Sequence, residues 1–281
     1  MTADILAEGK TKIIYQYRQP HLVRVENKPV VTWDDKYTQT MPGKDVWANT
    51  TTCRMFELML EDGIPVAFEE YLSPTEFLAP RCAMVPVEII LRFANEPESS
   101  YGKRNPRASL GPFATPQVEF FLKTSGRTFN GISFDFDDPY IHRYDETGMW
   151  VHDPKVPVDE EKLIFVPFDA QFGDEPVETF ERMRKLALDT GRLLKRMWNS
   201  LGWNLGDFKI ECGYATGELL VADVIDNDSW RIQGPDGVER SKQTIRTRWK
   251  NEGASALADI LREASLNYAM VAEAAERLTY R

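Results

Sequence analysis

The segment from Gly206 to Arg231 carries the most suggestive arrangement of charged residues in the chain. Its sequence, GDFKIECGYATGELLVADVIDNDSWR, predicts two short strands joined by a glycine-bounded turn. Asp207, Lys209 and Glu211 occupy every second position, and alternate residues of a strand leave the same face. Two carboxylates beside a lysine suit a site for Mg²⁺ and a polyphosphate, because the oxygens bind the metal and the ammonium offsets the phosphate charge.

The second predicted strand ends at Asp223, whose direction depends on the turn. A five-residue loop, Gly213–Gly217, would set Asp223 opposite Asp207, whereas a change of one residue would move it to the other face. The same spacing also fits an amphipathic hairpin with a charged, solvated face. Spacing alone does not separate these two interpretations.

A second group of basic residues follows a glycine near the N-terminus. Gly9-Lys10-Thr11-Lys12 resembles the end of a phosphate-binding P-loop, but Asp4 stands where that motif requires its first glycine. Lys10 and Lys12 would instead share one face of a strand next to a glycine turn, an arrangement that suits a triphosphate. A solvated edge strand protected by lysines fits the pattern equally well.

A third group could bind a phosphate monoester. Arg92 ends the apolar run VPVEIILR, and Ser100, Lys103 and Arg104 follow in a polar stretch. Arginine makes bidentate contacts with phosphate, and hydroxyl groups add further donors. The alternative is a basic loop that is simply solvated.

The composition indicates a globular protein with an acidic balance. The 281 residues include 34 Lys and Arg against 44 Asp and Glu, a net charge of −10, which disfavours broad binding to nucleic acid or to anionic membranes. The three cysteines lie far apart without a CxxC motif, as is typical of a reducing compartment. We therefore expect a cytoplasmic protein that acts on small molecules, and a homo-oligomer is left open.

Apolar periodicity predicts the elements that position these residues. Helices are expected over residues 45–62, 176–201 and 254–280, and strands over 11–33, 66–93 and 117–123. Residues 95–116 are expected to form a loop, and 124–170 loops with short hairpins. This order predicts an α+β fold rather than the strict alternation of a parallel doubly wound sheet.

Six motifs in chain order resemble those of the SAICAR synthetase family. They are GKTK, VPVEIILR, SxxKRNP, FFLK, DFKIE and ADVIDNDSWR. ADVIDNDSWR and APRCAMVPVE look especially like the synthetase half of the bifunctional animal enzyme. The resemblance implies a two-lobed architecture related to ATP-grasp and kinase-like folds. A small antiparallel β-rich lobe would comprise residues 1–90, and a larger α+β lobe residues 91–281, with ATP between them.

The resemblance also implies a reaction and its cofactors, ATP and Mg²⁺. ATP would phosphorylate the carboxylate of carboxyaminoimidazole ribonucleotide, a step of purine biosynthesis, and the amine of L-aspartate would attack the acyl phosphate to form an amide. Such a site must screen the charge of the transferred phosphoryl group with a metal ion and lysines.

Matching each motif to the family implies a role for each candidate residue. Gly9, Lys10, Lys12, Glu211 and Asp223 would bind the nucleotide, the last two through Mg²⁺. Lys123, Asp207 and Lys209 would carry the chemistry. Arg92, Ser100, Lys103, Asp138, Asp228 and Arg231 would bind the ribonucleotide substrate.

Two loops and one insertion depart from the family pattern. Residues 35–42, DKYTQTMP, lack the Ala-Gly-Asn/Asp of the family's substrate loop, and residues 94–100, ANEPESS, add two glutamates that would repel a phosphate. The family has an Asp-Pro pair in this region, and an insertion within 124–170 makes its counterpart in this chain ambiguous. We assign it to Asp138, with Asp153 as the alternative. These changes suggest as alternatives a paralogue with another nucleotide-like carboxylate or amine, or a nucleotide-binding regulator without catalysis.

Overall fold

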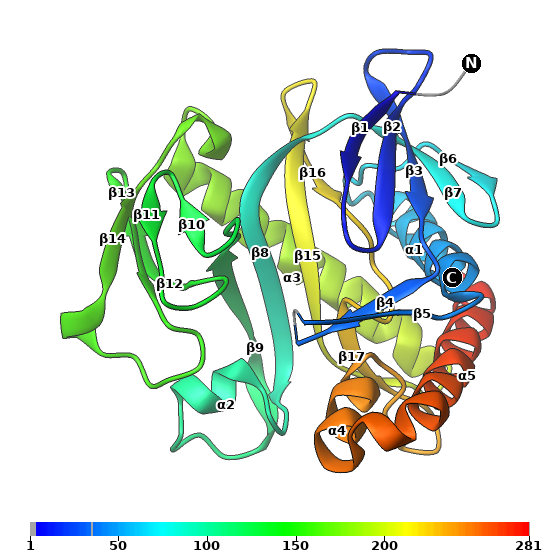
Figure 1. The fold of residues 1–281 in the computed structure, drawn as a ribbon. Coiled ribbons are helices and arrows are strands. Elements are labelled where there is room, and N and C mark those ends of the chain that lie inside the picture. Colours follow the sequence, from blue (N-terminus) through cyan, green and yellow to red (C-terminus); the bar gives the residue numbers. More distant parts are fainter. Residues whose placement is uncertain (1–3, 35, 281) are drawn as a thin grey trace. The chain divides into compact units, whose positions relative to one another are not determined.

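The computed structural model describes residues 4–34 and 36–280, so Asp35 of the predicted substrate loop lies outside the described residues. Its antiparallel strands and its helices form the predicted α+β fold (Figure 1). Contacts within the chain divide the described residues into two compact units, each discontinuous in sequence. The division into functional lobes at residue 90 stays a prediction.

The first unit comprises the described residues up to Cys82, Arg192–Leu205 and those from Ala222 onward. It contains a five-stranded sheet of order β1-β2-β3-β7-β6 and a separate β4–β5 hairpin. The strands are β1 Ile5–Glu8, β2 Lys12–Gln16, β3 Leu22–Asn27, β4 Val30–Trp33, β5 Tyr37–Thr40, β6 Glu70–Ser73, β7 Glu76–Pro80 and β17 Trp230–Gln233. Strands predicted over residues 11–33 are therefore confirmed.

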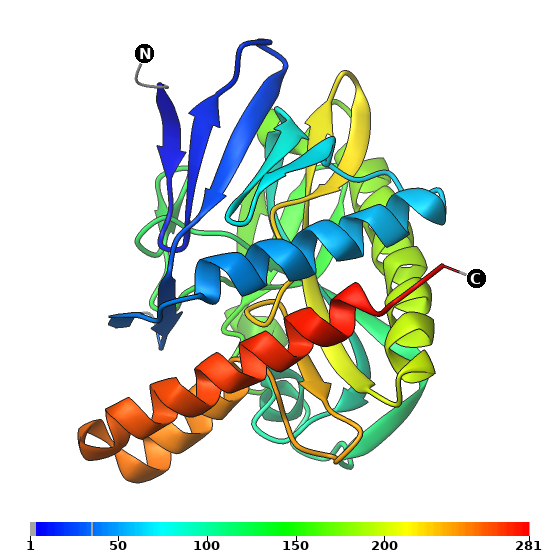
Figure 2. The ribbon, with the colours of Figure 1, turned by 90° about the vertical axis from the view of Figure 1, so that its right-hand side faces the viewer.

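Two long helices of the first unit pack against each other. Helix α1 (Lys44–Glu61) also contacts β3 and β7, and its partner α5 (Leu257–Glu276) runs beside it (Figure 2). The sequence predicted one helix over 254–280 and missed α4 (Gln243–Glu252) before it. Gly253 separates the two, because its φ of 69° is left-handed and ends α4.

The second unit comprises Ala83–Gly191 and Gly206–Val221 and is built on a larger antiparallel sheet. Its strands follow the order β14-β13-β12-β9-β8-β15-β16, and β17 pairs with β15, whose first residues belong to the first unit. The bounds are β8 Ala83–Asn95, β9 Gly111–Leu122, β12 Tyr140–Asp145, β13 Gly148–His152, β14 Ile164–Pro167, β15 Asn204–Ala215 and β16 Glu218–Ala222. A small hairpin pairs β10 (Thr128–Phe129) with β11 (Ile132–Ser133).

Helix α3 (Pro176–Ser200) covers one face of this sheet (Figure 1). A Cβ on its Gly191 would lie 2.3 Å from Leu91 Cδ2 and 3.2 Å from the ring of Phe208. A larger residue here would force Leu91 to shift, and the contact identifies the apolar face, where Leu91 and Phe208 are buried. Because strand residues alternate between faces, Asp207, Lys209 and Glu211 lie on the other face.

The turn between β15 and β16 is shorter than the sequence suggested. β15 continues to Ala215 and β16 begins at Glu218, so the loop is Thr216–Gly217 rather than Gly213–Gly217. Both loop residues have positive φ, 49° and 84°, as a two-residue type I′ hairpin requires. The five-residue loop that would set Asp223 opposite Asp207 is therefore not formed.

In the two segments that depart from the family pattern, 35–42 and 94–100, the described residues are largely in regular structure. Tyr37–Thr40 form β5, and Tyr37 stacks on Trp33 with their ring centroids 5.3 Å apart. β8 continues through Asn95, and the Ser99 hydroxyl caps the short helix α2 (Ser100–Arg104) by accepting from the Gly102 amide. The prediction of a plain loop over 95–116 was thus wrong, because capping and strand pairing order both of its ends.

Three 3₁₀ turns complete the described elements: Glu160–Lys162, Ala170–Phe172 and Ala254–Ala256. Within residues 4–34 and 36–280, no helix combines the length and the apolar character needed to cross a membrane.

Candidate active site

Lys209 lies between two carboxylates on the charged face of the second unit. Its Nζ is 2.8 Å from Glu211 Oε1 and 3.2 Å from Glu88 Oε1. Glu88 and Glu211 are directly opposite each other on β8 and β15. The predicted alternation along β15 therefore places Lys209 and Glu211 together, and the sheet adds Glu88, which the sequence reasoning did not select.

Lys123, just after β9, extends this row by a salt bridge to Glu211. We call Glu88, Lys209, Glu211 and Lys123 the lysine–carboxylate row. Glu211 is only 5% exposed, whereas Lys123 is 41% exposed, so Lys123 can move away from Glu211 into solvent. The predicted members Lys123, Lys209 and Glu211 thus lie in one cluster.

Both charges at the centre of the row are stable at neutral pH. Burial alone would raise the pKa of Glu211, but Lys209 and Lys123 outweigh it and lower that pKa to about 2. Burial likewise opposes the charge of Lys209, yet Glu88 and Glu211 raise its pKa far above the usual range. The row consequently offers an ionised carboxylate and an ammonium, which suit a metal ion and a phosphoryl group respectively.

Arg92 lies at the centre of a second cluster on the same face. Its Nη1 donates to Asp207 Oδ2 at 2.8 Å, its Nη2 to Ser100 Oγ at 2.9 Å and its Nε to Glu119 Oε2 at 2.5 Å. The predicted residues Arg92, Ser100 and Asp207 are therefore brought together. The third partner of Arg92, Glu119, comes from β9 and was missed, because only the register of β8 with β9 places it there.

Arg104 completes this buried arginine cluster of Arg92, Arg104, Glu119 and Asp207. Arg104 makes a salt bridge to Glu119, and both side chains are almost wholly buried. Two guanidinium groups thus balance two carboxylates. Lys103, which was predicted to bind substrate, is exposed, so its neighbour Arg104 is the basic residue of α2 that joins the cluster.

In the first unit, Lys12 and Asp223 form a salt bridge. β2 begins at Lys12, and Lys10 lies in the preceding turn, so the expectation that Lys10 and Lys12 share a strand face was wrong. The turn is closed by the Gly9 amide, which donates to the Lys12 carbonyl at 2.9 Å. Gly9 and Lys10 are exposed.

Asp228 belongs to a buried cluster in the first unit. Lys44 Nζ is 3.1 Å from Asp228 Oδ2, Lys242 Nζ is 3.8 Å from Oδ1, and the Tyr268 hydroxyl donates to the same carboxylate. Burial opposes the charge of Asp228, but Lys242 and Lys44 lower its pKa well below the usual range. Lys44 and Tyr268 were missed. Lys44 is the first residue of α1, where a cation opposes the helix dipole. This unfavourable position was the signal in the sequence that could have identified Lys44.

The remaining predicted residues are placed as follows. Arg231 is half-buried on β17, between buried Trp230 and Ile232. Asp138 has a φ of 43° and accepts from the Thr124 amide at 3.3 Å. The alternative, Asp153, accepts from the Lys155 amide at 2.7 Å and so stabilises a turn, whereas Asp138 ties its loop to the residue after Lys123.

The donor chemistry of the predicted metal ligands fits Mg²⁺, which prefers carboxylate oxygens. Glu211 is ionised, and both Glu211 and Asp223 are paired with lysines. The two ligands belong to different compact units. Among the residues that the structure describes, no three His, Cys, Asp or Glu side chains gather into a metal-binding group.

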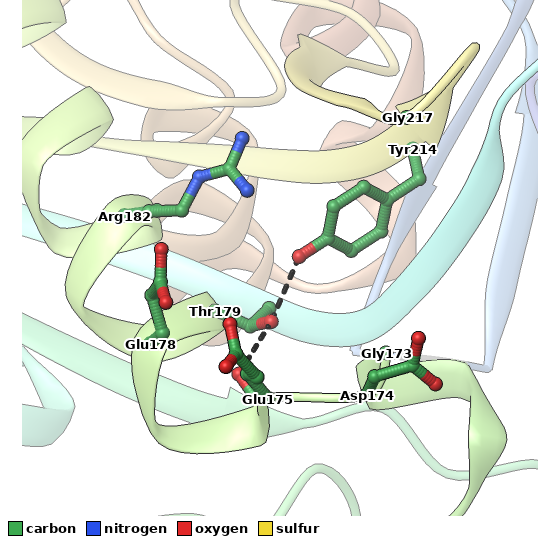
Figure 3. A pocket seen from close by; sticks show the side chains of 8 residues that line it. All are labelled: Gly173, Asp174, Glu175, Glu178, Thr179, Arg182, Tyr214 and Gly217. Atoms are coloured by element: carbon green, nitrogen blue, oxygen red, sulfur yellow. Dashed lines mark hydrogen bonds between the residues drawn. The ribbon is translucent and has the colours of Figure 1, made fainter.

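A pocket of about 550 Å³ opens on the α3 side of the second unit (Figure 3). Tyr214 and Thr179 lie in its wall with their hydroxyl oxygens 2.8 Å apart, beside Arg182. Thr179 belongs to α3, which covers the apolar face of the sheet, so the pocket lies on the face opposite the lysine–carboxylate row. We therefore do not assign the predicted chemistry to this pocket.

Comparisons with known proteins address the class directly. The family model of SAICAR synthetase matches residues 5–135 and 158–260. A phosphoribosylaminoimidazole-succinocarboxamide synthase of Chloroflexus aurantiacus is 34% identical over 278 residues, which cover 96% of this chain and 94% of the relative. The bifunctional purine synthesis protein purC/E of Dictyostelium discoideum is 33% identical over 247 residues, covering 86% of this chain but 22% of that protein. The multifunctional protein ADE2 of Gallus gallus is 32% identical over 249 residues, covering 85% of this chain and 51% of that protein.

Solved structures give the same fold at low sequence identity. The phosphoribosylaminoimidazole-succinocarboxamide synthase of Ehrlichia chaffeensis has a TM-score of 0.71 at 20% identity and covers 99% of this chain and 100% of that one. A SAICAR synthetase in complex with ADP has a TM-score of 0.70 at 18% identity, covering 98% and 99%.

The fold and the family match define an ATP-dependent carboxylate–amine ligase. The chain belongs to the SAICAR synthetase family. The predictions of family, fold class and enzyme class are confirmed. The family match omits residues 136–157, so neither Asp138 nor Asp153 lies in a matched segment.

Proposed function

We propose that this protein joins L-aspartate to the carboxylate of carboxyaminoimidazole ribonucleotide, with ATP as the energy source, in purine biosynthesis. The relative from Chloroflexus aurantiacus, which is matched over nearly its whole length, is by name a phosphoribosylaminoimidazole-succinocarboxamide synthase, and this similarity supports the proposal. The lysine–carboxylate row is the structural observation that carries the proposal, because it keeps an ammonium and a carboxylate charged side by side.

The reaction proceeds through an acyl phosphate in this proposal. A carboxylate is a poor electrophile until one oxygen becomes a good leaving group, so ATP first phosphorylates it and the aspartate amine then displaces phosphate. The ammonium of Lys209 offsets charge on the transferred phosphoryl group, and Lys12 binds the nucleotide phosphates. Glu211 and Asp223 would supply carboxylate oxygens to Mg²⁺, and the ion would add charge neutralisation for the phosphoryl group.

We assign the binding of the ribonucleotide substrate to Arg92 and the residues around it. Ser100 and Arg231 contribute donors for the ribonucleotide phosphate. All three nitrogens of Arg92 already have protein partners, so a phosphate that contacts Arg92 must take the place of one of them. Ser100 is the partly exposed partner and the one that a substrate can replace.

The test is ADP release with Mg-ATP, carboxyaminoimidazole ribonucleotide and L-aspartate, each omitted in turn. Turnover that requires all three supports the proposal. If ADP release does not occur while ATP binding measured by titration is intact, the substrate pair is wrong. The two segments that depart from the family pattern, 35–42 and 94–100, would then be the places to look for altered substrate specificity.

A further inference from the structure

The segment that the family match omits, residues 136–157, forms β12 and β13 and widens the sheet of the second unit. β12 pairs with β9 at Tyr140 and Phe121, and β13 pairs with β12 along its length. We call residues 136–157 the inserted segment. Its attachment to β9 places it beside the strand that carries Glu119.

Two residues of the inserted segment contact the guanidinium of Arg104. Arg104 Cζ lies 4.1 Å from the ring centroid of Tyr140 and 5.1 Å from that of Phe121, which are cation–π distances. Its Nη1 donates to the Pro154 carbonyl at 3.0 Å. Tyr140 and Pro154 both belong to the inserted segment, and Arg104 is 4% exposed.

Arg104 in turn fixes the carboxylate that orients Arg92. Glu119 accepts from Arg104 on Oε1 and from Arg92 Nε on Oε2, and Glu119 itself is 6% exposed. A bidentate carboxylate between two guanidinium groups has one orientation that satisfies both. If Arg104 is lost, one buried oxygen of Glu119 is left without its charged donor, and the carboxylate can rotate away from Arg92.

We propose that Arg104 is a positioning residue: the inserted segment holds Arg104, Arg104 orients Glu119, and Glu119 sets the direction in which Arg92 presents its guanidinium to Ser100. The inserted segment thereby tunes the affinity for the phosphorylated substrate without touching it. The effect on substrate affinity rests on the proposed function, whereas the positions of Arg92 and Glu119 do not.

The first measurement needs no substrate. In the Arg104→Lys variant, a single ammonium replaces the guanidinium that reaches both Glu119 and the Pro154 carbonyl. In Tyr140→Leu, the aromatic face under the guanidinium is removed. The matched control is Trp150→Leu, which removes another aromatic ring of the inserted segment, one that packs at a tilt against Phe165 instead. Folding of each variant is verified by circular dichroism.

The readout is the exchange of the Arg92 Nε–H proton with water, followed by NMR and assigned by its loss in Arg92→Lys. We expect exchange to accelerate about tenfold or more in Arg104→Lys and in Tyr140→Leu, because a hydrogen bond to a charged group is worth about that factor. The control should exchange at the wild-type rate. If both folded test variants exchange like wild type, or if Trp150→Leu accelerates exchange equally, Arg104 does not position Arg92. Should Arg104→Lys fail to fold, Tyr140→Leu decides the result alone.

The second measurement separates this inference from the proposed function. If wild type turns over carboxyaminoimidazole ribonucleotide, the two test variants should raise the KM for it by about tenfold and leave kcat and the KM for ATP near wild type. A fall in kcat of equal size in the test variants and in Trp150→Leu would mean a merely structural role and would refute positioning. Absence of wild-type turnover refutes the proposed function only, because the exchange rates are measured without substrate.

Discussion

Glu211→Gln is the substitution that tests the lysine–carboxylate row most directly. It keeps the shape of the side chain but removes the charge that pairs with Lys209 and Lys123. The pKa of Glu211 falls from an ordinary 4.5 to about 2 in the folded protein. Since each unit of difference corresponds to about 1.4 kcal/mol, the ionised carboxylate contributes on the order of 3 kcal/mol to folding at neutral pH.

The pH dependence follows from the direction of this shift. Because the folded pKa is lowered, the contribution is complete above pH 4.5 and is lost as the pH falls through about 2. We therefore expect the variant to have a lower free energy of unfolding than wild type at pH 7, by about 3 kcal/mol at most. The difference should shrink by roughly half near pH 3, and urea denaturation at both pH values measures it.

The same variant should abolish ATP turnover, because a neutral amide is a poor ligand for Mg²⁺ and leaves Lys209 with Glu88 as its remaining carboxylate partner in the row. ADP release by the folded variant is the assay. The matched control is Glu178→Gln, an exposed carboxylate at the start of α3, which should change neither quantity. ADP formation at the wild-type rate, or a stability difference that does not depend on pH, would refute this reasoning.

Three further substitutions test other parts of the structure. Arg231→Ala should weaken binding of the phosphorylated substrate far more than of its dephosphorylated nucleoside, by titration; equal losses would show that the phosphate site is misassigned. Tyr268→Phe removes the hydroxyl that donates to buried Asp228 and should lower the free energy of unfolding by about 1–2 kcal/mol, and an unchanged urea midpoint would contradict that bond. Gly191→Ala places a Cβ against Leu91 and should destabilise by about 1–3 kcal/mol, whereas a neutral effect would mean that α3 shifts freely on the sheet.

Local patterns in the sequence were sufficient for the elements and for part of the site. The spacing of Asp207, Lys209 and Glu211 predicted a strand with these side chains on one face, and β15 has them there. Apolar periodicity predicted α1 and α3 almost to their ends. These features depend on alternation and helical repeat, which are properties of neighbouring residues.

Turn geometry was the main local failure. The glycines at 213 and 217 suggested the bounds of a loop, yet Gly213 lies within β15 and Thr216 adopts the left-handed conformation beside Gly217. A glycine permits a turn but does not require one, so the register of the hairpin could not be read from composition. The same limit applies to Lys10, which falls in the turn before β2.

The sequence by itself determined the family, the fold class and which side chains of one strand share a face, because ordered motifs and periodicity are carried by the chain locally. Only the tertiary structure decided which charges meet. Glu88 reaches Lys209 through the pairing of β8 with β15, Glu119 reaches Arg92 through the pairing of β8 with β9, and Lys44 reaches Asp228 from a helix far away in sequence. These neighbouring charges then outweigh burial and shift the pKa values of Lys209 and Asp228, and neither register nor burial is fixed by the spacing of residues along the chain.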